Sequence, residues 1–232
     1  MKIAIHQPNF LPWIGYFHKI SKVDRFVFFD NVQLPRGKSY CNRTKILING
    51  RTSWLTIPIL GKSAKPMIKD TKVDNSKNWK KKHLKTLELN YKNTKFFSDI
   101  FPLIINVYNI DSDYLVDFNI PLILNLSKYL TLNVNFIKSS DILLKNEISG
   151  LNKIIAILKQ LSTNIYFSGS GAGSKRYIRE EVFYTNGIKL EWQNFKSFEY
   201  NQLNTTEFVN GLSIIDLLFN CGKKSKEFLL RK

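Results

Sequence analysis

The first 30 residues hold a complete strand–loop–helix–strand unit, which constrains the fold more than any other feature of the sequence. A short strand over residues 2–6 is ended by Pro8, and Pro12 stands near the start of the next helix. Residues 13–23 place apolar side chains three and four positions apart, which predicts an amphipathic helix, and residues 26–29 are all apolar, which predicts a second strand. Because a helix connects the two strands, we expect them to be parallel.

A β-hairpin and a helical region are expected next. An Asn-Gly pair at 49–50 separates the strand-like runs 38–48 and 51–59, and such a pair is the strongest local signal for a hairpin. Residues 60–76 are expected to form a loop. Three helices are then predicted, over residues 77–93, 96–109 and 113–131.

The second half of the chain returns to alternating helices and strands. Predicted strands cover residues 134–137, 165–167 and 189–193, and predicted helices cover residues 147–161, 176–185 and 212–219. Together these elements predict an α/β fold with an open, largely parallel Rossmann-like sheet, a β-hairpin excursion and a helical insertion. We expect one domain over residues 1–232, with the helical subregion at 77–131.

Composition excludes several classes of protein. The apolar fraction of 44% excludes wholesale disorder, and two cysteines cannot build a disulfide framework or a Cys-rich metal site. Apolar runs are much shorter than the ~20 residues that span a bilayer, and the N-terminus lacks a signal-peptide pattern. We therefore expect a cytoplasmic protein with no transmembrane segment. No His, Asp, Glu or Cys cluster has metal-ligand spacing, so no metal is expected, and the cofactor is unknown.

Positive charge is concentrated in one quarter of the chain. The formal net charge is +17, and residues 33–95 carry 16 basic and three acidic side chains, a net of +13. Such a segment attracts nucleotide sugars, phosphates, nucleic acid or acidic lipid. The lysine-rich composition also fits an AT-rich genome, so a specific anionic partner and a compositional origin both stay open.

A polar and aromatic loop follows the first strand, at the edge where open α/β sheets bind ligands. His6 and Gln7 begin this loop, and an unperturbed histidine pKa near 6.5 suits a proton acceptor. Trp13 and Tyr16 can either contact a ligand or belong to the core.

The same loop closely resembles the opening of the WbqC-like family of bacteria, read here as His6-Gln7-Pro8-Asn9-Phe10-Leu11-Pro12-Trp13-Ile14-Gly15-Tyr16-Phe17. Further matches follow in the expected order: Phe29-Asp30, Asn42-Arg43, Trp54 to Pro58, Trp79, Lys82-His83-Leu84, Tyr91, Phe167-Ser168-Gly169, Tyr200-x-Gln202 and Leu212 to Asn220. The resemblance implies a place in surface-polysaccharide (O-antigen) biosynthesis, where members are suggested to be glycine transferases acting on amino sugars. It also raises His83 and Gln202 to candidate substrate-binding residues.

A Gly- and Ser-rich loop, residues 168–176, is a candidate phosphate site. It lies after a predicted strand, and Ser168 and Gly169 with the cations Lys175 and Arg176 are the residues we expect to contact phosphate. The loop lacks the Walker A and dinucleotide-binding spacings, and a plain flexible loop is the alternative.

Three further residues come from the predicted second and third strands. Asp30 is a candidate catalytic residue that orients a base or an amine, and Arg43 is a candidate phosphate clamp, unless the two form a structural salt bridge. Asn42, with Gln7, is a candidate donor to an oxyanion.

Asp216 lies on an apolar helix, where a carboxylate requires a partner. It can serve as a helix cap, as a member of a buried ion pair or as a catalytic group.

Three functions are compatible with these residues. The first is transfer of a glycyl, other aminoacyl or acyl group to an amino sugar, which we expect to be nucleotide-linked. His6 is then the general base, activated glycine or aminoacyl-tRNA is the donor, and Arg43, Lys175 and Arg176 hold the diphosphate. The second is non-catalytic nucleic-acid binding by residues 33–95, with Trp54, Trp79 and Tyr91 stacking on bases. The third is a glycosyltransferase-like enzyme or a degenerate nucleotidylyltransferase-like enzyme.

Overall fold

A five-stranded sheet forms the centre of the computed structural model, which describes the chain except residues 36, 38, 62–63, 145–148, 204 and 232. The strands lie in the order β5-β2-β1-β6-β7 and every pairing between them is parallel. Numbered along the chain, this order is 3-2-1-4-5, the arrangement of one Rossmann half with its adjoining strands. The bounds are β1 Lys2–His6, β2 Arg25–Phe28, β5 Asn135–Lys138, β6 Ile165–Ser168 and β7 Lys189–Trp192.

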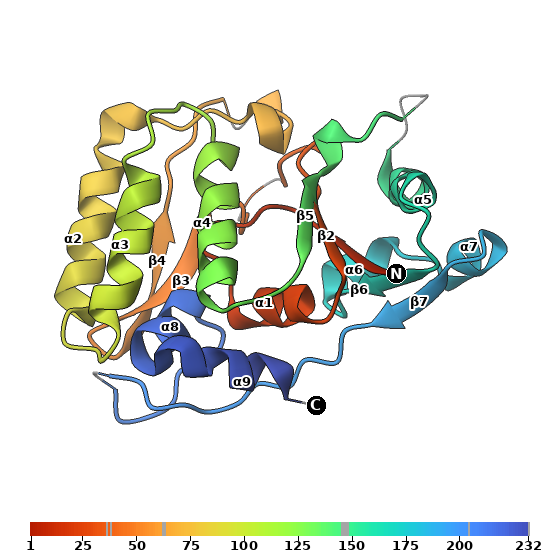
Figure 1. Cartoon of the computed structure of the whole chain (residues 1–232). Coiled ribbons are helices and arrows are strands. Elements are labelled where there is room, and N and C mark those ends of the chain that lie inside the picture. Colours follow the sequence, from red (N-terminus) through yellow and green to blue (C-terminus); the bar gives the residue numbers. More distant parts are fainter. Residues whose placement is uncertain (36, 38, 62–63, 145–148, 204, 232) are drawn as a thin grey trace.

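Helices cover both faces of this sheet (Figure 1). Ile3, Ile5 and Val27 point to one face and pack with apolar residues of α5 (Gly150–Gln160) and α7 (Glu180–Thr185). Ala4, Phe26 and Phe28 point to the other face and pack against α1 (Ile14–Ser21). Because both faces are covered, successive residues of β1 and β2 are buried, which is why these strands read as continuous apolar runs.

The helical region and the hairpin lie to one side of the sheet, on the α1 face (Figure 1). Their apolar residues belong to the same buried cluster as Phe26 and Phe28, so one core runs from the sheet into the helices. The elements are β3 Arg43–Ile48, β4 Arg51–Thr56, α2 Trp79–Tyr91, α3 Phe97–Tyr108, α4 Val116–Tyr129, α8 Ile214–Cys221 and α9 Ser225–Leu230. Within the described part of the chain, no helix is long and apolar enough to cross a bilayer.

The structure confirms the predicted α/β class, the mostly parallel sheet and the separate hairpin. Asn49 and Gly50 have φ angles of 48° and 73°, as a two-residue type I′ turn requires. Three details differ from the prediction. The third strand begins only at Arg43, two short helices, α6 (Ala172–Tyr177) and α7, replace the single helix expected over 176–185, and α9 was not predicted.

The loop between β1 and α1 is fixed by elements that are far away in the sequence. Leu11 has a φ of 37°, an unfavourable conformation for a residue other than glycine, and its side chain is fully buried. Its carbonyl oxygen accepts one hydrogen bond from Thr44 Oγ1 at 2.9 Å and another from Ser213 Oγ at 2.7 Å. The Ile214 amide also donates to the carbonyl of Pro12 at 2.8 Å. The hairpin and the start of α8 therefore hold this loop together.

A double-mutant cycle tests this arrangement. Thr44→Val removes one hydroxyl donor and should lower the free energy of unfolding by about 1 kcal/mol, whereas Ser213→Ala removes the other donor together with the N-cap of α8 and should lower it by about 2 kcal/mol. The double variant leaves the Leu11 carbonyl buried without a donor, so its loss should exceed the sum of the single losses, by on the order of 1 kcal/mol. Urea unfolding of the four proteins measures these values. Strictly additive losses would show that the two hydroxyls do not act on one oxygen.

Candidate functional site

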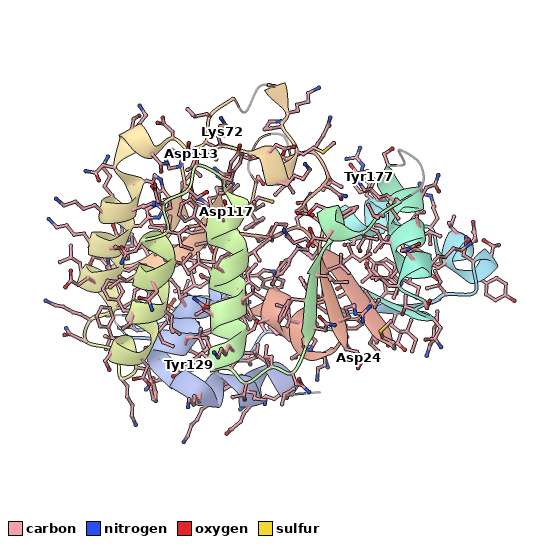
Figure 2. All side chains as sticks on the ribbon, turned by 45° about the horizontal axis from the view of Figure 1, so that its top comes forward. Asp24, Lys72, Asp113, Asp117, Tyr129 and Tyr177 are labelled. Atoms are coloured by element: carbon pink, nitrogen blue, oxygen red, sulfur yellow. The ribbon has the colours of Figure 1, made fainter. Side chains whose placement is uncertain are left out.

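A cavity of about 670 Å³ opens at the carboxyl edge of the sheet, between the ends of β1 and β6. The strand order reverses at this point, which is where ligands bind in open α/β sheets. Figure 2 shows Asp24, which precedes β2, near the lower edge of the view and Tyr177, the last residue of α6, well above it. The described lining residues are His6, Asn9, Trp13, Gly15, Tyr16, Lys19, Tyr40, Lys45, Gly169, Ser170, Gly171, Gly173, Ser174, Gln193, Phe195 and Gly211.

His6 is the last residue of β1 and is half-buried in the cavity wall. Its Nδ1 atom lies 3.1 Å from the Gln7 carbonyl oxygen, which can only accept, so Nδ1 carries the proton and Nε2 carries the lone pair. No described residue forms a hydrogen bond with Nε2. Burial, assisted by the nearby charge of Lys19, lowers the pKa of His6 to about 3. The ring is therefore a neutral proton acceptor at neutral pH.

Aromatic side chains hold the His6 ring in place. Tyr16 is buried, meets the His6 ring edge to face at 4.8 Å between centroids, and donates its hydroxyl to the Gln7 carbonyl at 3.0 Å. Trp13 is 40% exposed, and its ring covers Gly15, where a Cβ atom would overlap it. Both aromatic residues therefore line the cavity, and Tyr16 also belongs to the buried core, so ligand contact by either residue stays a prediction.

Lys19 was not predicted and is the most unusual residue of the cavity. It lies on α1, is 3% exposed, and forms no ion pair or hydrogen bond through Nζ with any described residue. Burial alone lowers its pKa to about 7. Sequence patterns give little sign of this residue, because a lysine beside the apolar stripe of α1 resembles one whose ammonium reaches solvent.

The Gly- and Ser-rich loop after β6 forms another wall of the cavity, but its cations do not. Gly169 lines the cavity, while Ser168 is buried just before it and donates its hydroxyl to the Gly169 carbonyl at 3.3 Å. Lys175 and Arg176 are exposed on α6 and do not line the cavity. The phosphate contact predicted for these two side chains therefore has no support from their position.

Asp30 lies outside the cavity. Its carboxylate accepts hydrogen bonds from the Ser140 amide at 2.9 Å, from the Ser140 hydroxyl at 2.6 Å and from Ser139 Oγ at 2.9 Å. These bonds join the end of β2 to the turn after β5. The structure thus places Asp30 in a role that stabilises the sheet edge, and it forms no salt bridge with Arg43.

Gln7 and Asn42, the predicted oxyanion donors, also point elsewhere. Asn42 Nδ2 donates to the Ile57 carbonyl at 2.9 Å, and Gln7 Oε1 lies 3.6 Å from the Cys41 sulfur. Asn9, which sequence analysis did not single out, lines the cavity instead. Its Oδ1 atom lies 3.6 Å from the same Cys41 sulfur, whose single proton can bond only one of the two amide oxygens at a time, and its Nδ2 group is a hydrogen-bond donor.

Arg43 belongs to a rim of aromatic and cationic side chains on the hairpin side. Its guanidinium lies 3.9 Å from the centroid of the Trp54 ring, and Lys45 Nζ lies 5.5 Å from the same ring. Tyr40 also contacts Trp54, with 5.8 Å between ring centroids. Tyr40 and Lys45 line the cavity, so this rim adjoins it.

His83 is buried and Gln202 is partly buried, and the side chains of both are hydrogen-bonded to other parts of the protein. His83 Nε2 donates to the Thr56 carbonyl at 3.0 Å and Nδ1 accepts from the Tyr108 hydroxyl at 3.1 Å. Gln202 donates to Asp216 Oδ1 at 3.1 Å and accepts from the Val209 amide at 2.7 Å. Neither residue lines the cavity, so the structure does not place them beside its ligand.

Two aromatic residues that were predicted to stack on bases are not available to do so. Trp79 and Tyr91 are buried, with 3% and 2% of their surface exposed.

Among the described residues, no group of three or more His, Cys, Asp or Glu side chains is positioned to hold a metal ion.

A parallel sheet in Rossmann order with a polar cavity at its switch point defines the structural class of this protein. The model of the WbqC-like protein family matches residues 7–228, and the chain belongs to this family. The chain is also 29% identical over 231 residues to "Uncharacterized protein Rv1507c" of Mycobacterium tuberculosis (strain ATCC 25618 / H37Rv), with 98% of this chain and 97% of that protein covered. No solved structure matches the chain significantly.

The buried histidines predict how stability depends on pH. Burial lowers the pKa of His6 to about 3 and those of His18 and His83 to about 4, against about 6.5 in an unfolded chain. The unfolded state therefore binds more protons than the folded state as pH falls from 6.5 towards 4, so stability should decrease over this range.

Replacing one histidine should flatten this dependence. Each histidine contributes up to about 1.4 kcal/mol per pH unit, so His83→Gln should reduce the slope of the unfolding free energy by about that amount while lowering stability at pH 7. Urea unfolding at pH 7, 6 and 5 measures the slope. An unchanged slope would mean that His83 takes up its proton equally well in the folded protein.

Proposed function

We propose that this protein transfers a glycyl, another aminoacyl or an acyl group to the amine of a nucleotide-linked amino sugar in surface-polysaccharide biosynthesis. The observation that carries this proposal is His6, a neutral imidazole whose Nε2 lone pair is without a partner among the described residues, in a cavity at the switch point of the sheet. Membership of the WbqC-like family supports the same class of reaction.

The reaction requires one proton acceptor and one oxyanion donor. The sugar amine attacks the carbonyl carbon of the activated donor, so that a C–N bond forms and the bond to the leaving group breaks. His6 Nε2 accepts the amine proton and returns it to the leaving group, while the Gln7 carbonyl keeps the ring in the required tautomer. Asn9 Nδ2 is the side-chain donor assigned to the carbonyl oxygen as it gains charge, because Asn9 lines the cavity and Gln7 does not.

A direct assay tests the class of reaction. Purified protein is incubated with a panel of nucleotide-linked amino sugars and with glycyl donors that include an activated thioester and glycyl-tRNA, and products are analysed by mass spectrometry. The expected product is heavier than its sugar nucleotide by one glycyl or acyl group. Absence of product with every donor would reject the transferase proposal.

The role of His6 gives a sharper prediction. His6→Gln should preserve folding and sugar-nucleotide affinity but lower kcat by about 10²–10⁴-fold, because the amide cannot accept the amine proton. His83→Gln is the matched control, since it makes the same substitution at a core histidine and should alter stability rather than kcat. Near-normal turnover by His6→Gln would reduce His6 to a structural residue.

One observation favours a second candidate function, non-catalytic binding of nucleic acid. Tyr40 and Trp54 are 52% and 39% exposed, and they lie beside Arg43 and Lys45 within the strongly basic segment 33–95. Aromatic side chains with adjacent cations can stack on bases and contact the phosphate backbone. Micromolar affinity for single-stranded RNA that falls steeply with salt, together with no affinity for sugar nucleotides, would favour this function over transfer.

A further inference from the structure

The charge of the cavity wall is one-sided. Lys19 and Lys45 contribute the cationic groups and His6 is neutral, whereas the described lining residues include no aspartate or glutamate. A cavity of about 670 Å³ has the size of a site for a nucleotide-sized molecule rather than for a single small ion. A wall of this composition favours a ligand that brings several negative charges.

Lys19 is the buried cation of this wall, and no described residue pairs with it. Its side chain is 3% exposed, yet no described carboxylate or hydrogen-bond acceptor contacts Nζ. A buried ammonium without a partner is costly, and the protein carries that cost in the unliganded state. An anion in the cavity would supply the missing partner.

The loop after β6 places its polar groups beside the Lys19 ammonium. A Cβ atom built on Gly169 would lie 2.9 Å from Lys19 Nζ and 3.5 Å from Ser174 Oγ. The absence of a side chain at Gly169 therefore leaves room for Nζ beside the loop, and Ser174 adds a hydroxyl donor at the same place. Ser170, Gly171 and Gly173 continue the wall.

We infer that Lys19 and the loop Gly169–Ser174 bind the diphosphate of a nucleoside diphosphate, the anionic part of the activated-sugar substrate. The inference deepens the proposed function and rests on it for the identity of the sugar. It assigns the binding cation to Lys19 inside the cavity rather than to the exposed Lys175 and Arg176. The second cation of the wall, Lys45, and the exposed Tyr40 lie where the rest of the nucleotide can extend.

The pH dependence of binding follows from the lowered pKa of Lys19, about 7. Only the ammonium form attracts the diphosphate, so affinity should decrease as pH rises above 7, by up to tenfold per unit. The titratable groups that face Lys19 are His6 from β1, Tyr16 from α1, and Tyr40 and Lys45 from the hairpin side; the Gly169–Ser174 loop has none. His6, with a pKa of about 3, and Tyr16, whose pKa burial raises well above 10, do not titrate in this range.

Calorimetric titration with uridine diphosphate, adenosine diphosphate and inorganic pyrophosphate tests the site without any acyl donor. At pH 7, Lys19→Met should weaken nucleoside diphosphate binding at least tenfold. Between pH 7 and 9, where the diphosphate itself stays ionised, the affinity of the variant should no longer decrease with pH. Lys175→Met and Arg176→Met, which remove exposed charges from the neighbouring α6, should each change affinity less than twofold. Equal weakening by the α6 variants, or a Lys19→Met protein that binds like the parent, would overturn the inference.

Two further measurements separate lost binding from unfolding and test the space beside Lys19 Nζ. Lys19→Met removes an unpaired buried charge, so the unliganded variant should melt at a higher temperature than the parent, and its loss of binding cannot be attributed to unfolding. Gly169→Ala keeps the lysine but fills the space beside Nζ, and should weaken binding about threefold or more.

The outcomes also separate this inference from the proposed function. Binding that depends on Lys19 without any acyl transfer would reject the transfer reaction and keep the diphosphate site. Transfer to a sugar nucleotide with an unchanged KM in Lys19→Met would reject the site and keep the reaction. Failure of the parent protein to bind any of the three probes would overturn the site.

Discussion

The carbonyl oxygen of Leu11 joins the parts of the chain that build the cavity. It accepts hydroxyl donors from the hairpin and from the start of α8, while the positive φ of Leu11 turns the chain from β1 towards α1. A residue other than glycine keeps such a backbone conformation only where its surroundings determine it strongly. Asn9 lies before this point and Trp13 after it, and both line the cavity. The shape of the site therefore depends on contacts between segments about 30 and 200 residues apart.

A second buried polar network also joins α8 to the hairpin. Asp216 is fully buried and forms no ion pair with any described cation; its carboxylate accepts from the hydroxyls of Tyr91 at 2.9 Å and Tyr200 at 2.7 Å. Burial raises the pKa of Asp216, and these donors oppose that shift. The Tyr91 hydroxyl in turn accepts from the Leu47 amide at 3.0 Å, which ties α2, α8 and the hairpin together. Within the described part of the chain Asp216 has neither of the expected structural partners, a helix cap or an ion pair; the two tyrosine hydroxyls and the Gln202 amide take their place.

The sequence predicted the elements well and the site only in part, for physical reasons. Strand and helix positions depend on local periodicity and on turn residues such as Asn49-Gly50, so the parallel sheet and the hairpin followed from the sequence. The positions of three other residues depend on partners that are distant in the sequence. Asp30 is bonded to Ser139 and Ser140, and His83 is bonded to Thr56 and Tyr108. Lys19 lies against the Gly169 loop. The family motifs do not separate these cases, because they combine cavity residues such as His6 and Tyr16 with core residues such as His83 and Tyr91.

The charge of Lys19 also affects the pKa of His6. The positive charge of Lys19 is one of the causes that lower the pKa of His6, the larger cause being burial. If a diphosphate pairs with Lys19 as we infer, its negative charge offsets the lysine, and the pKa of both groups must rise. His6 then becomes a stronger base when the substrate is present, and Lys19 stays protonated at a higher pH. A histidine that is a weak base in the empty cavity is therefore compatible with proton transfer in the complex, since the substrate's own charge brings its pKa closer to neutrality.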